Sequence, residues 1–369
     1  MKTVLISGAS VAGPALAYWL NRHGFAPTVV ERAPAPRIGG HAIDVRGVAL
    51  EVADRMDLLV PLRRLRTRMR GMSVLDGDGN EIMRSTDYAM SSGRLDGDDI
   101  EVLREDLTRL LHERTAAGTE YVFGDSIARI EHDEDGVQVE FERGRPRTFD
   151  LVVGADGLHS TVRRLAFGPE AEFIHHLGTY VSVFTTENLL NLEDWQLWIR
   201  DGHAGGGIYP ARDNTELRVN LGFESEPVDY DHRDLDAQRR LVADRLAGMR
   251  WEIPRLLKAM WQAPDFYFDA MAQIRMDSWA RGRVTLVGDA GYCASPMSGQ
   301  GTSLALVGAY VLAAELAAAR GDHRSALAGY ERRMRPFAEL NQALATENPG
   351  GPASEESIER AKDAIALDA

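Results

Sequence analysis

Cysteine, basic charge and long hydrophobic runs are all scarce in this sequence, and each scarcity excludes a class of protein. The single cysteine, Cys293, leaves no internal disulfide and no cysteine-based metal cluster, which favours a reducing, cytoplasmic setting. Lys and Arg number 42 against 56 Asp and Glu, and the net charge of −14 argues against a broad nucleic-acid-binding face. The longest apolar stretch, residues 304–319, contains Glu315 and is shorter than the ~20 residues that span a bilayer. We therefore expect a cytoplasmic protein with no membrane span, no nucleic-acid partner and no metal site.

The remaining composition is that of a folded, globular chain. Its 369 residues, 44% hydrophobic and 27% charged, predict two or three domains. The N-terminus begins with a strand at 3–7, a helix at 14–23 and a second strand at 27–31. This βαβ unit predicts a parallel sheet with a right-handed crossover. Residues 170–275 alternate between polar and apolar, which predicts an inserted, mostly antiparallel sheet with helical cover.

The chain returns to the first sheet after this insertion, so the expected domains are discontinuous. The strand that follows Arg283, VTLVGDA, has the same buried pattern as the first strand. We predict an α/β fold with an α+β insert. The first domain comprises residues 1–70, 96–168 and 276–342. The second comprises residues 71–95 and 169–275, and residues 343–369 form a C-terminal tail with a weak helix.

A glycine-punctuated turn joins the first strand to the first helix. Gly8-Ala9-Ser10-Val11-Ala12-Gly13 follows the GxGxxG dinucleotide-binding pattern, with Ser10 in the place of the second glycine. Glycine lets the backbone approach a pyrophosphate closely, and the helix N-terminus adds partial positive charge. Glu31 ends the second strand, where an acid accepts hydrogen bonds from ribose hydroxyls and disfavours a 2′-phosphate. The turn predicts a bound dinucleotide, and an ordinary glycine turn is the alternative.

Two later motifs carry a resemblance to a known family. Residues 150–163, DLVVGADGLHSTVR, place Asp156 after a buried strand, and residues 282–304, GRVTLVGDAGYCASPMSGQGTSL, place Asp289 after another. With the first turn, they resemble the single-component (class A) FAD-dependent aromatic hydroxylases, which include para-hydroxybenzoate hydroxylase and the tetracycline-inactivating monooxygenases. The resemblance extends from the N-terminus to about residue 340. It implies a Rossmann-like FAD-binding domain and a substrate-binding domain built from the inserted sheet.

The same resemblance implies which residues bind FAD. Asp289 would bond the ribityl chain, and the helix N-terminus at 299–302 would stabilise the reduced isoalloxazine. Arg104 would reach the cofactor from a helix, and Arg46 and Asp156 would lie near its pyrophosphate. A surface salt bridge is the alternative for either arginine. The full expected set is Gly8, Ser10, Ala12, Gly13, Glu31, Arg32, Arg46, Arg104, Asp156, Asp289, Pro296, Gly299, Gly301 and Thr302.

A substrate pocket is expected between the flavin and the inserted sheet. Its apolar or aromatic lining is predicted to include Phe184, Trp198, Tyr209, Phe223 and Met297, and a core position is the alternative for each. No catalytic base stands out, although Tyr209 and His41 are candidates by position.

Three further features are interpreted as structural. Gly205-Gly206-Gly207 lies between strand-like segments and predicts a hairpin bend rather than a phosphate loop. His175-His176 has no third ligand at metal spacing. Cys293 is interpreted as a buried thiol rather than a covalent flavin link.

The resemblance also implies an activity, that of an FAD-dependent NAD(P)H:O₂ monooxygenase. NADPH or NADH would reduce FAD in a transient encounter, and O₂ would then form a flavin C4a-hydroperoxide. Its distal oxygen would hydroxylate an electron-rich aromatic or polyketide-like small molecule. The alternatives are a flavin-dependent reductase or dehydrogenase, a flavin-dependent halogenase suggested by Trp195 and Trp198, and a flavin-binding sensor without enzymatic activity.

Overall fold

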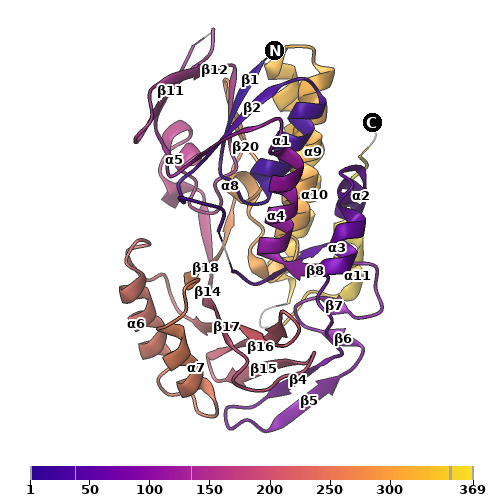
Figure 1. The fold of residues 1–369 in the computed structure, drawn as a ribbon, viewed down its shortest axis with the longest axis vertical. Helices are drawn as coiled ribbons and strands as arrows, with labels where there is room; N and C mark the ends of the chain where they lie inside the picture. The colour runs from indigo at the N-terminus through magenta and orange to yellow at the C-terminus, as the bar shows by residue number, and fades with distance from the viewer. Residues whose placement is uncertain (1, 38, 134, 349–350, 368–369) are drawn as a thin grey trace.

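The computed structural model describes residues 2–37, 39–133, 135–348 and 351–367, and it stacks two large sheets along the long axis of the molecule (Figure 1). The upper sheet has six strands in the order β19-β20-β13-β1-β2-β9. Its strands are β1 (Thr3–Ser7), β2 (Ala26–Glu31), β9 (Glu120–Phe123), β13 (Leu151–Gly154), β19 (Ala280–Arg281) and β20 (Val284–Leu286). All neighbours are parallel except β19 and β20. The N-terminal βαβ unit and the return of the late strand are therefore as predicted.

Other elements cover both faces of the six-stranded sheet. Its central strand β1 is therefore buried on both sides, which suits its apolar sequence. Residues 4–7 of β1 are all buried. One face carries helices α1 (Ala12–Arg22), α4 (Arg104–Thr115), α9 (Gly301–Ala318) and α10 (His323–Glu347) (Figure 1). The other carries α5 (Thr161–Ala166) and the antiparallel sheet of β10 (Ile127–His132), β11 (Val137–Phe141) and β12 (Arg147–Phe149).

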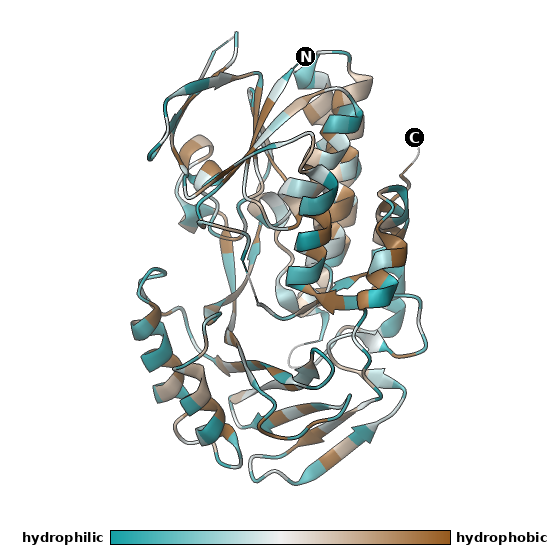
Figure 2. Cartoon of the chain, viewed as in Figure 1, coloured by the Kyte–Doolittle hydropathy of each residue, from teal (hydrophilic) through white to brown (hydrophobic). Residues whose placement is uncertain are grey.

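Helix α9 is the one helix among the described residues that is long and apolar enough to cross a membrane. Within this fold it packs between α1 and α10, and 61% of the helix is buried inside the protein. A helix that is hydrophobic on every side suits such a central position. By contrast, α6 (Leu235–Arg245) is largely hydrophilic in Figure 2, and it buries only Gln238 and Val242.

The lower sheet has seven strands in the order β18-β14-β17-β16-β15-β4-β5. They are β4 (Met72–Leu75), β5 (Glu81–Ser85), β14 (Ile174–Glu187), β15 (Gln196–Asp201), β16 (Ala204–Ala211), β17 (Glu216–Glu224) and β18 (Tyr267–Ile274). All pairs are antiparallel except β4 with β15. Helices α6 and α7 (Ile253–Met260) cover the face turned away from the upper sheet (Figure 1).

Short elements complete the chain between and beside the two sheets. They are β3 (Ala42–Val45), α2 (Val48–Arg55), α3 (Leu59–Leu65), β6 (Tyr88–Ala89), β7 (Gly93–Arg94), β8 (Ile100–Leu103), η1 (Glu170–Glu172), α8 (Asp289–Tyr292), η2 (Pro296–Ser298) and α11 (Glu355–Lys362). Strands β3 and β8 form an antiparallel pair that the sequence analysis does not anticipate. This pair lies near the junction of the two stacked parts (Figure 1).

The mixed α/β architecture is confirmed, whereas the prediction of a hairpin bend at Gly205-Gly206-Gly207 is wrong. All three glycines lie inside β16, and the β15–β16 turn is at Gly202 and His203. A Cβ on Gly206 would lie 1.9 Å from the carbonyl oxygen of Asn220, so the run lets neighbouring strands approach closely. The expected tail also begins later than residue 343, because α10 continues to Glu347.

Candidate functional site

The turn after β1 is closed tightly enough to require glycine at both ends. Gly8 has φ +109°, and a Cβ there would lie 2.3 Å from the carbonyl oxygen of Ala155 on the neighbouring strand. A Cβ on Gly13 would lie 1.9 Å from the carbonyl oxygen of Gly8. Val11 precedes α1 without a side-chain cap, so the first N–H groups of the helix remain available to an anionic ligand.

Glu31 fixes this turn to the end of β2. Its Oε2 accepts a hydrogen bond from the Ala9 N–H at 2.9 Å, and its Oε1 accepts one from the Ala33 N–H at 2.9 Å. The carboxylate therefore lies beside the glycine turn, as the dinucleotide pattern predicts. Ser10 is half-buried in the same turn, while the side chain of Arg32 is exposed to solvent.

The carboxylate of Asp156 is held by hydrogen bonds within the fold. The carboxylate accepts hydrogen bonds from Ser7 Oγ, Ser160 Oγ, the Thr161 N–H and the Val162 N–H. It thereby joins β1 to the start of α5. Burial raises the pKa of Asp156, and the hydrogen bond from Ser160 works in the opposite direction. The side chain supports the nucleotide turn from behind.

Asp289, at the start of α8, combines crowding with exposure. Burial raises the pKa of its carboxyl group, yet its side chain remains exposed to solvent. A carboxyl group can be surrounded by protein and still contact solvent only where an open space lies beside it. Gly301, at the start of α9, faces the same space, because a Cβ there would meet Asp289 Oδ1 at 3.8 Å. This arrangement presents a carboxylate and a helix N-terminus to one ligand.

Buried polar atoms without protein partners gather next to the start of α9. Within the described residues, neither side-chain polar atom of Gln300 has a hydrogen-bond partner, and the same is true of Asp44 Oδ1 and Arg46 Nε. The Arg46 guanidinium bonds Asp44 Oδ2 at 2.9 Å, and it lies 3.5 Å from where a Cβ of Gly299 would stand. Buried polar groups are normally satisfied, so this cluster calls for a ligand with donors and acceptors. Thr302 follows in the same half-buried turn.

Arg104 and His41 lie together at the end of the β3–β8 pair, where β3 begins and β8 ends. The Arg104 guanidinium donates to the Gly39 carbonyl oxygen at 3.0 Å, and the Arg104 N–H donates to the His41 carbonyl oxygen at 3.2 Å. Burial and the neighbouring Arg104 charge lower the pKa of His41 to about 4, so its imidazole is neutral at pH 7. Burial also lowers the pKa of Arg104. The guanidinium is half-buried and does not form a surface salt bridge in the described structure.

Two of the predicted pocket residues, Trp198 and Tyr209, lie on the face of the lower sheet opposite to α6 and α7, because their strand neighbours Ile199 and Ile208 belong to the core beneath those helices. The Tyr209 hydroxyl accepts a hydrogen bond from the Ala42 N–H of β3 at 2.8 Å. Trp198, on the next strand, lies over Gly207, where a Cβ would meet the indole at 2.7 Å. Its Nε1 donates to Gln196 Oε1 at 3.1 Å. Pro296 and Met297 of η2 are exposed rather than packed into a core.

The prediction that Phe184 and Phe223 line the same pocket is wrong. Both are buried in the second hydrophobic core, together with Val242 of α6 and Leu256 of α7. Successive residues of a strand point to opposite faces of the sheet. Phe184 and Phe223 both point to the face that packs against α6 and α7. The sequence shows which residues are aromatic, but it does not show which face of an inserted strand each one occupies.

Comparisons with known proteins decide the family. The model of an FAD binding domain matches residues 1–345. A flavin-dependent monooxygenase from an unknown prokaryotic organism is 40% identical over 343 residues, which cover 93% of this chain and 88% of that protein. The chain belongs to the FAD-dependent monooxygenases. The resemblance inferred from the motifs is thereby confirmed.

Two further similarities extend over nearly the whole monooxygenase. An uncharacterized protein of Mycobacterium tuberculosis is 52% identical over 369 residues, covering 100% of this chain and 99% of the relative. Among solved structures, tetracycline destructase Tet(51) superposes with a TM-score of 0.87 at 36% identity. The superposition covers 98% of this chain and 95% of that one. The fold class predicted from the sequence is therefore the fold of the family.

The residues of this monooxygenase suit FAD in charge and shape. The glycine turn leaves the first N–H groups of α1 open to an anion such as a pyrophosphate, and the exposed carboxylate of Asp289 is an acceptor suited to hydroxyl groups. The unpartnered atoms of Asp44, Arg46 and Gln300 include both donors and acceptors, which a flavin ring edge requires. Sequence reasoning missed Asp44 and Gln300. Gln300 lies inside the GQG motif and is visible in the sequence, whereas Asp44 lies in β3, a short strand that no sequence motif indicates.

Proposed function

We propose that this FAD-dependent monooxygenase uses NADPH or NADH and O₂ to hydroxylate an electron-rich aromatic or polyketide-like small molecule in the cytoplasm. One observation carries the proposal: the unpartnered polar atoms beside α9 include Asp44 Oδ1 of β3, and the Ala42 N–H of the same strand donates to the Tyr209 hydroxyl of the lower sheet. A ring held between them would lie next to the flavin site. One oxygen atom enters the product, and the other leaves as water with the two electrons from NAD(P)H.

We assign binding and orienting roles to the site residues. FAD, when bound, supplies two-electron reduction and oxygen activation. Asp289 accepts hydroxyl hydrogens of the cofactor chain, and the N-terminus of α9 offers N–H groups to its ring edge. Trp198 and Tyr209 provide an aromatic wall, which also excludes water from the reacting atoms. Arg104, held by Gly39, contributes positive charge beside the start of β3.

Neither candidate for a catalytic base has a pKa suited to that role. Burial raises the pKa of the Tyr209 hydroxyl, so the phenol keeps its proton at pH 7. The pKa of His41, lowered to about 4 by burial and by Arg104, makes its imidazole a weak base. We therefore assign hydrogen bonding to both residues and expect the acceptor to be ionised before it binds.

The test is a substrate screen with isotopically labelled oxygen. Phenols and polyketides, including tetracyclines because of the structural similarity to tetracycline destructase, are incubated with the enzyme, FAD and NADPH or NADH. We expect one class to stimulate NAD(P)H consumption and to yield a product carrying one ¹⁸O atom from ¹⁸O₂. An Asp289→Ala variant serves as the flavin-depleted control.

The outcomes separate the competing functions. Stimulated NAD(P)H oxidation without labelled product would support the reductase or dehydrogenase alternative instead. If FAD binds but no compound stimulates NAD(P)H oxidation, the proposed substrate class is wrong.

A further inference from the structure

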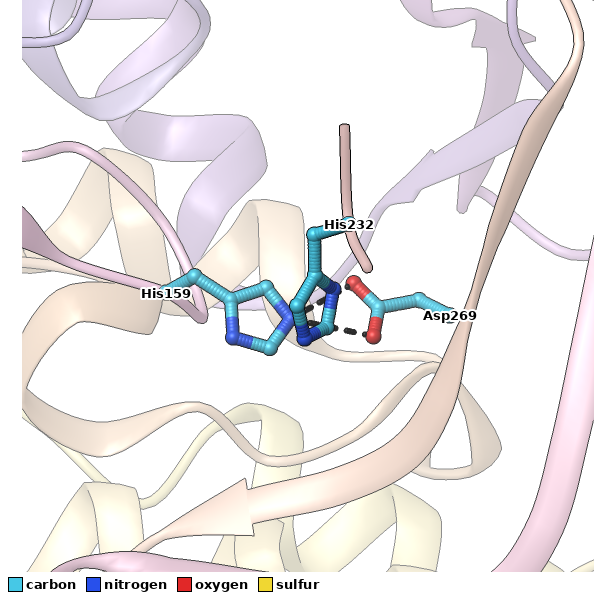
Figure 3. A group of neighbouring side chains, drawn as sticks. All are labelled: His159, His232 and Asp269. Carbon is cyan, nitrogen blue, oxygen red and sulfur yellow. Dashed lines mark hydrogen bonds and ion pairs between the residues drawn. The ribbon is translucent and has the colours of Figure 1, made fainter. Parts of the chain in front are cut away.

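His159, His232 and Asp269 form a cluster of three metal-ligating side chains from separate segments of the chain (Figure 3). His159 comes from the turn between β13 and α5, and His232 comes from the loop after β17. Asp269 belongs to β18. One donor atom from each residue lies within 4.8 Å of the others. The three residues are too far apart in the sequence to suggest a metal site, which explains why none is expected from the motifs.

We propose that His159, His232 and Asp269 bind one divalent transition-metal ion, of the type represented by Zn²⁺. Two imidazoles and one carboxylate form a ligand set that zinc accepts readily, with water in the fourth position. Mg²⁺ and Ca²⁺ prefer all-oxygen ligands and do not match this set. The site is distinct from the residues assigned to FAD.

The distance between the donor atoms of His159 and Asp269 is close to the distance between two ligands of one metal ion. His159 Nε2 lies 3.0 Å from Asp269 Oδ1 and 3.1 Å from Oδ2. Two ligands that are each ~2.0–2.2 Å from Zn²⁺ at a tetrahedral angle are roughly 3.3–3.6 Å apart. A small opening of this pair therefore admits an ion. His232 already lies beside His159, with 4.1 Å between the ring centroids.

Supporting hydrogen bonds hold the ligands in the way that metal sites require. His159 Nδ1 lies 2.8 Å from Glu170 Oε1, which gives the carboxylate–histidine pairing common behind bound metals. Arg163 fixes the other oxygen of Glu170 at 2.8 Å. The hydroxyl groups of Tyr230 and Tyr267 donate to Asp269 at 3.2 and 2.8 Å, so the carboxylate is oriented before any ion arrives.

The two ring nitrogens of His159 have different partners. Nδ1 lies against Glu170 Oε1, whereas Nε2 lies against Asp269 and is the atom that would bind the ion. A histidine binds a metal as the neutral imidazole, so any proton on Nε2 is released to water as the ion binds, while the Nδ1–H donates to Glu170.

The cluster is accessible, and its position suggests what the ion does. His232 is exposed, His159 is half-buried and Asp269 is buried, so an ion enters from solvent without an opening of the core. His159 belongs to the upper part of the molecule, whereas Asp269 belongs to the lower sheet. A bound ion therefore links the two parts.

The experiment is equilibrium dialysis of the tag-free, FAD-loaded protein against micromolar Zn²⁺, with metal counted by mass spectrometry. We expect one Zn²⁺ per chain in the wild type and in His203→Ala, which removes an exposed histidine paired with Glu224. His232→Ala should bind at least tenfold more weakly. Glu170→Gln should bind roughly 10–100-fold more weakly, because it loses the support behind His159.

FAD content and circular dichroism establish that each variant is folded. Because His232 is exposed, we expect His232→Ala to keep its fold and flavin even where Asp269 variants do not. No retained zinc in the wild type would overturn the proposal. Equal zinc binding by the wild type and His232→Ala would overturn it as well.

Discussion

Asp44 and Glu101 stand directly opposite one another in the β3–β8 ladder, and both are buried. Two carboxylates in direct cross-strand register repel each other when both are charged. Arg46 bonds Asp44, and Ser91 Oγ donates to Glu101. Burial, followed by the charge of Asp44, raises the pKa of Glu101 to about 7. Burial likewise raises the pKa of Asp44 to about 6.

Glu101→Gln is expected to stabilise the protein at alkaline pH. A carboxyl group with a raised pKa contributes its full stability below its ordinary pKa and loses it as the pH rises through about 7. The amide keeps an acceptor for Ser91 but carries no charge. Thermal unfolding should show little change near pH 5 and a gain on the order of 1–3 kcal/mol at pH 8. Glu193→Gln, at an exposed position, should show no such pH dependence.

Asp289→Ala is expected to lose most of its FAD while remaining folded. One or two charge-assisted hydrogen bonds are worth roughly 1.5–3 kcal/mol each, so affinity should fall tenfold to a thousandfold. Fluorescence titration of the apoprotein measures the change. Asp244→Ala, an exposed position on α6, should bind like the wild type. An unchanged dissociation constant for Asp289→Ala would remove this residue from the cofactor site.

Gly8→Ala and Gly24→Ala separate backbone strain from steric collision. Both glycines have positive φ, at +109° and +78°. Alanine at either position is therefore strained, because an L-residue with a Cβ rarely adopts positive φ. Only Gly8 faces a collision, 2.3 Å from the Ala155 oxygen, whereas nothing lies within 4 Å of a Cβ on Gly24. Chemical denaturation should show a loss of about 1–2 kcal/mol for Gly24→Ala. Gly8→Ala should lose FAD or fail to fold, and equal losses would contradict the geometry.

Cys293 is expected to be unreactive and not linked to the flavin. The residue is buried, its Sγ lies 3.6 Å from the Ala272 carbonyl oxygen, and burial raises the pKa of the thiol well above its usual range. The thiolate is the reactive form, so a thiol-specific dye should label the denatured but not the native protein. Acid should release intact FAD, and Cys293→Ser should retain it. Flavin that stays on the denatured chain would contradict this prediction.

The sequence predicts the parts of this fold whose signals are local. The first βαβ unit, the glycine turn and Glu31 lie within about thirty consecutive residues, and their periodicity is sufficient. By contrast, two features depend on contacts between segments that are distant in the sequence. These are the face of the lower sheet on which Phe184 lies and the pairing of Asp44 with Glu101. A shift of one residue in register reverses a strand's faces, so aromatic composition alone does not distinguish Trp198 from Phe184. The cluster of His159, His232 and Asp269 is invisible for the same reason.

The position of β20 in the upper sheet has a consequence for biosynthesis. β1 is synthesised long before β20, yet its neighbour β13 pairs on the far side with β20, at residues 284–286. The helix that covers this sheet, α9, follows later still. A nascent chain that has only reached β18 therefore exposes an unpaired strand edge and an uncovered apolar face. Fragments that end before α9 should therefore aggregate rather than bind flavin.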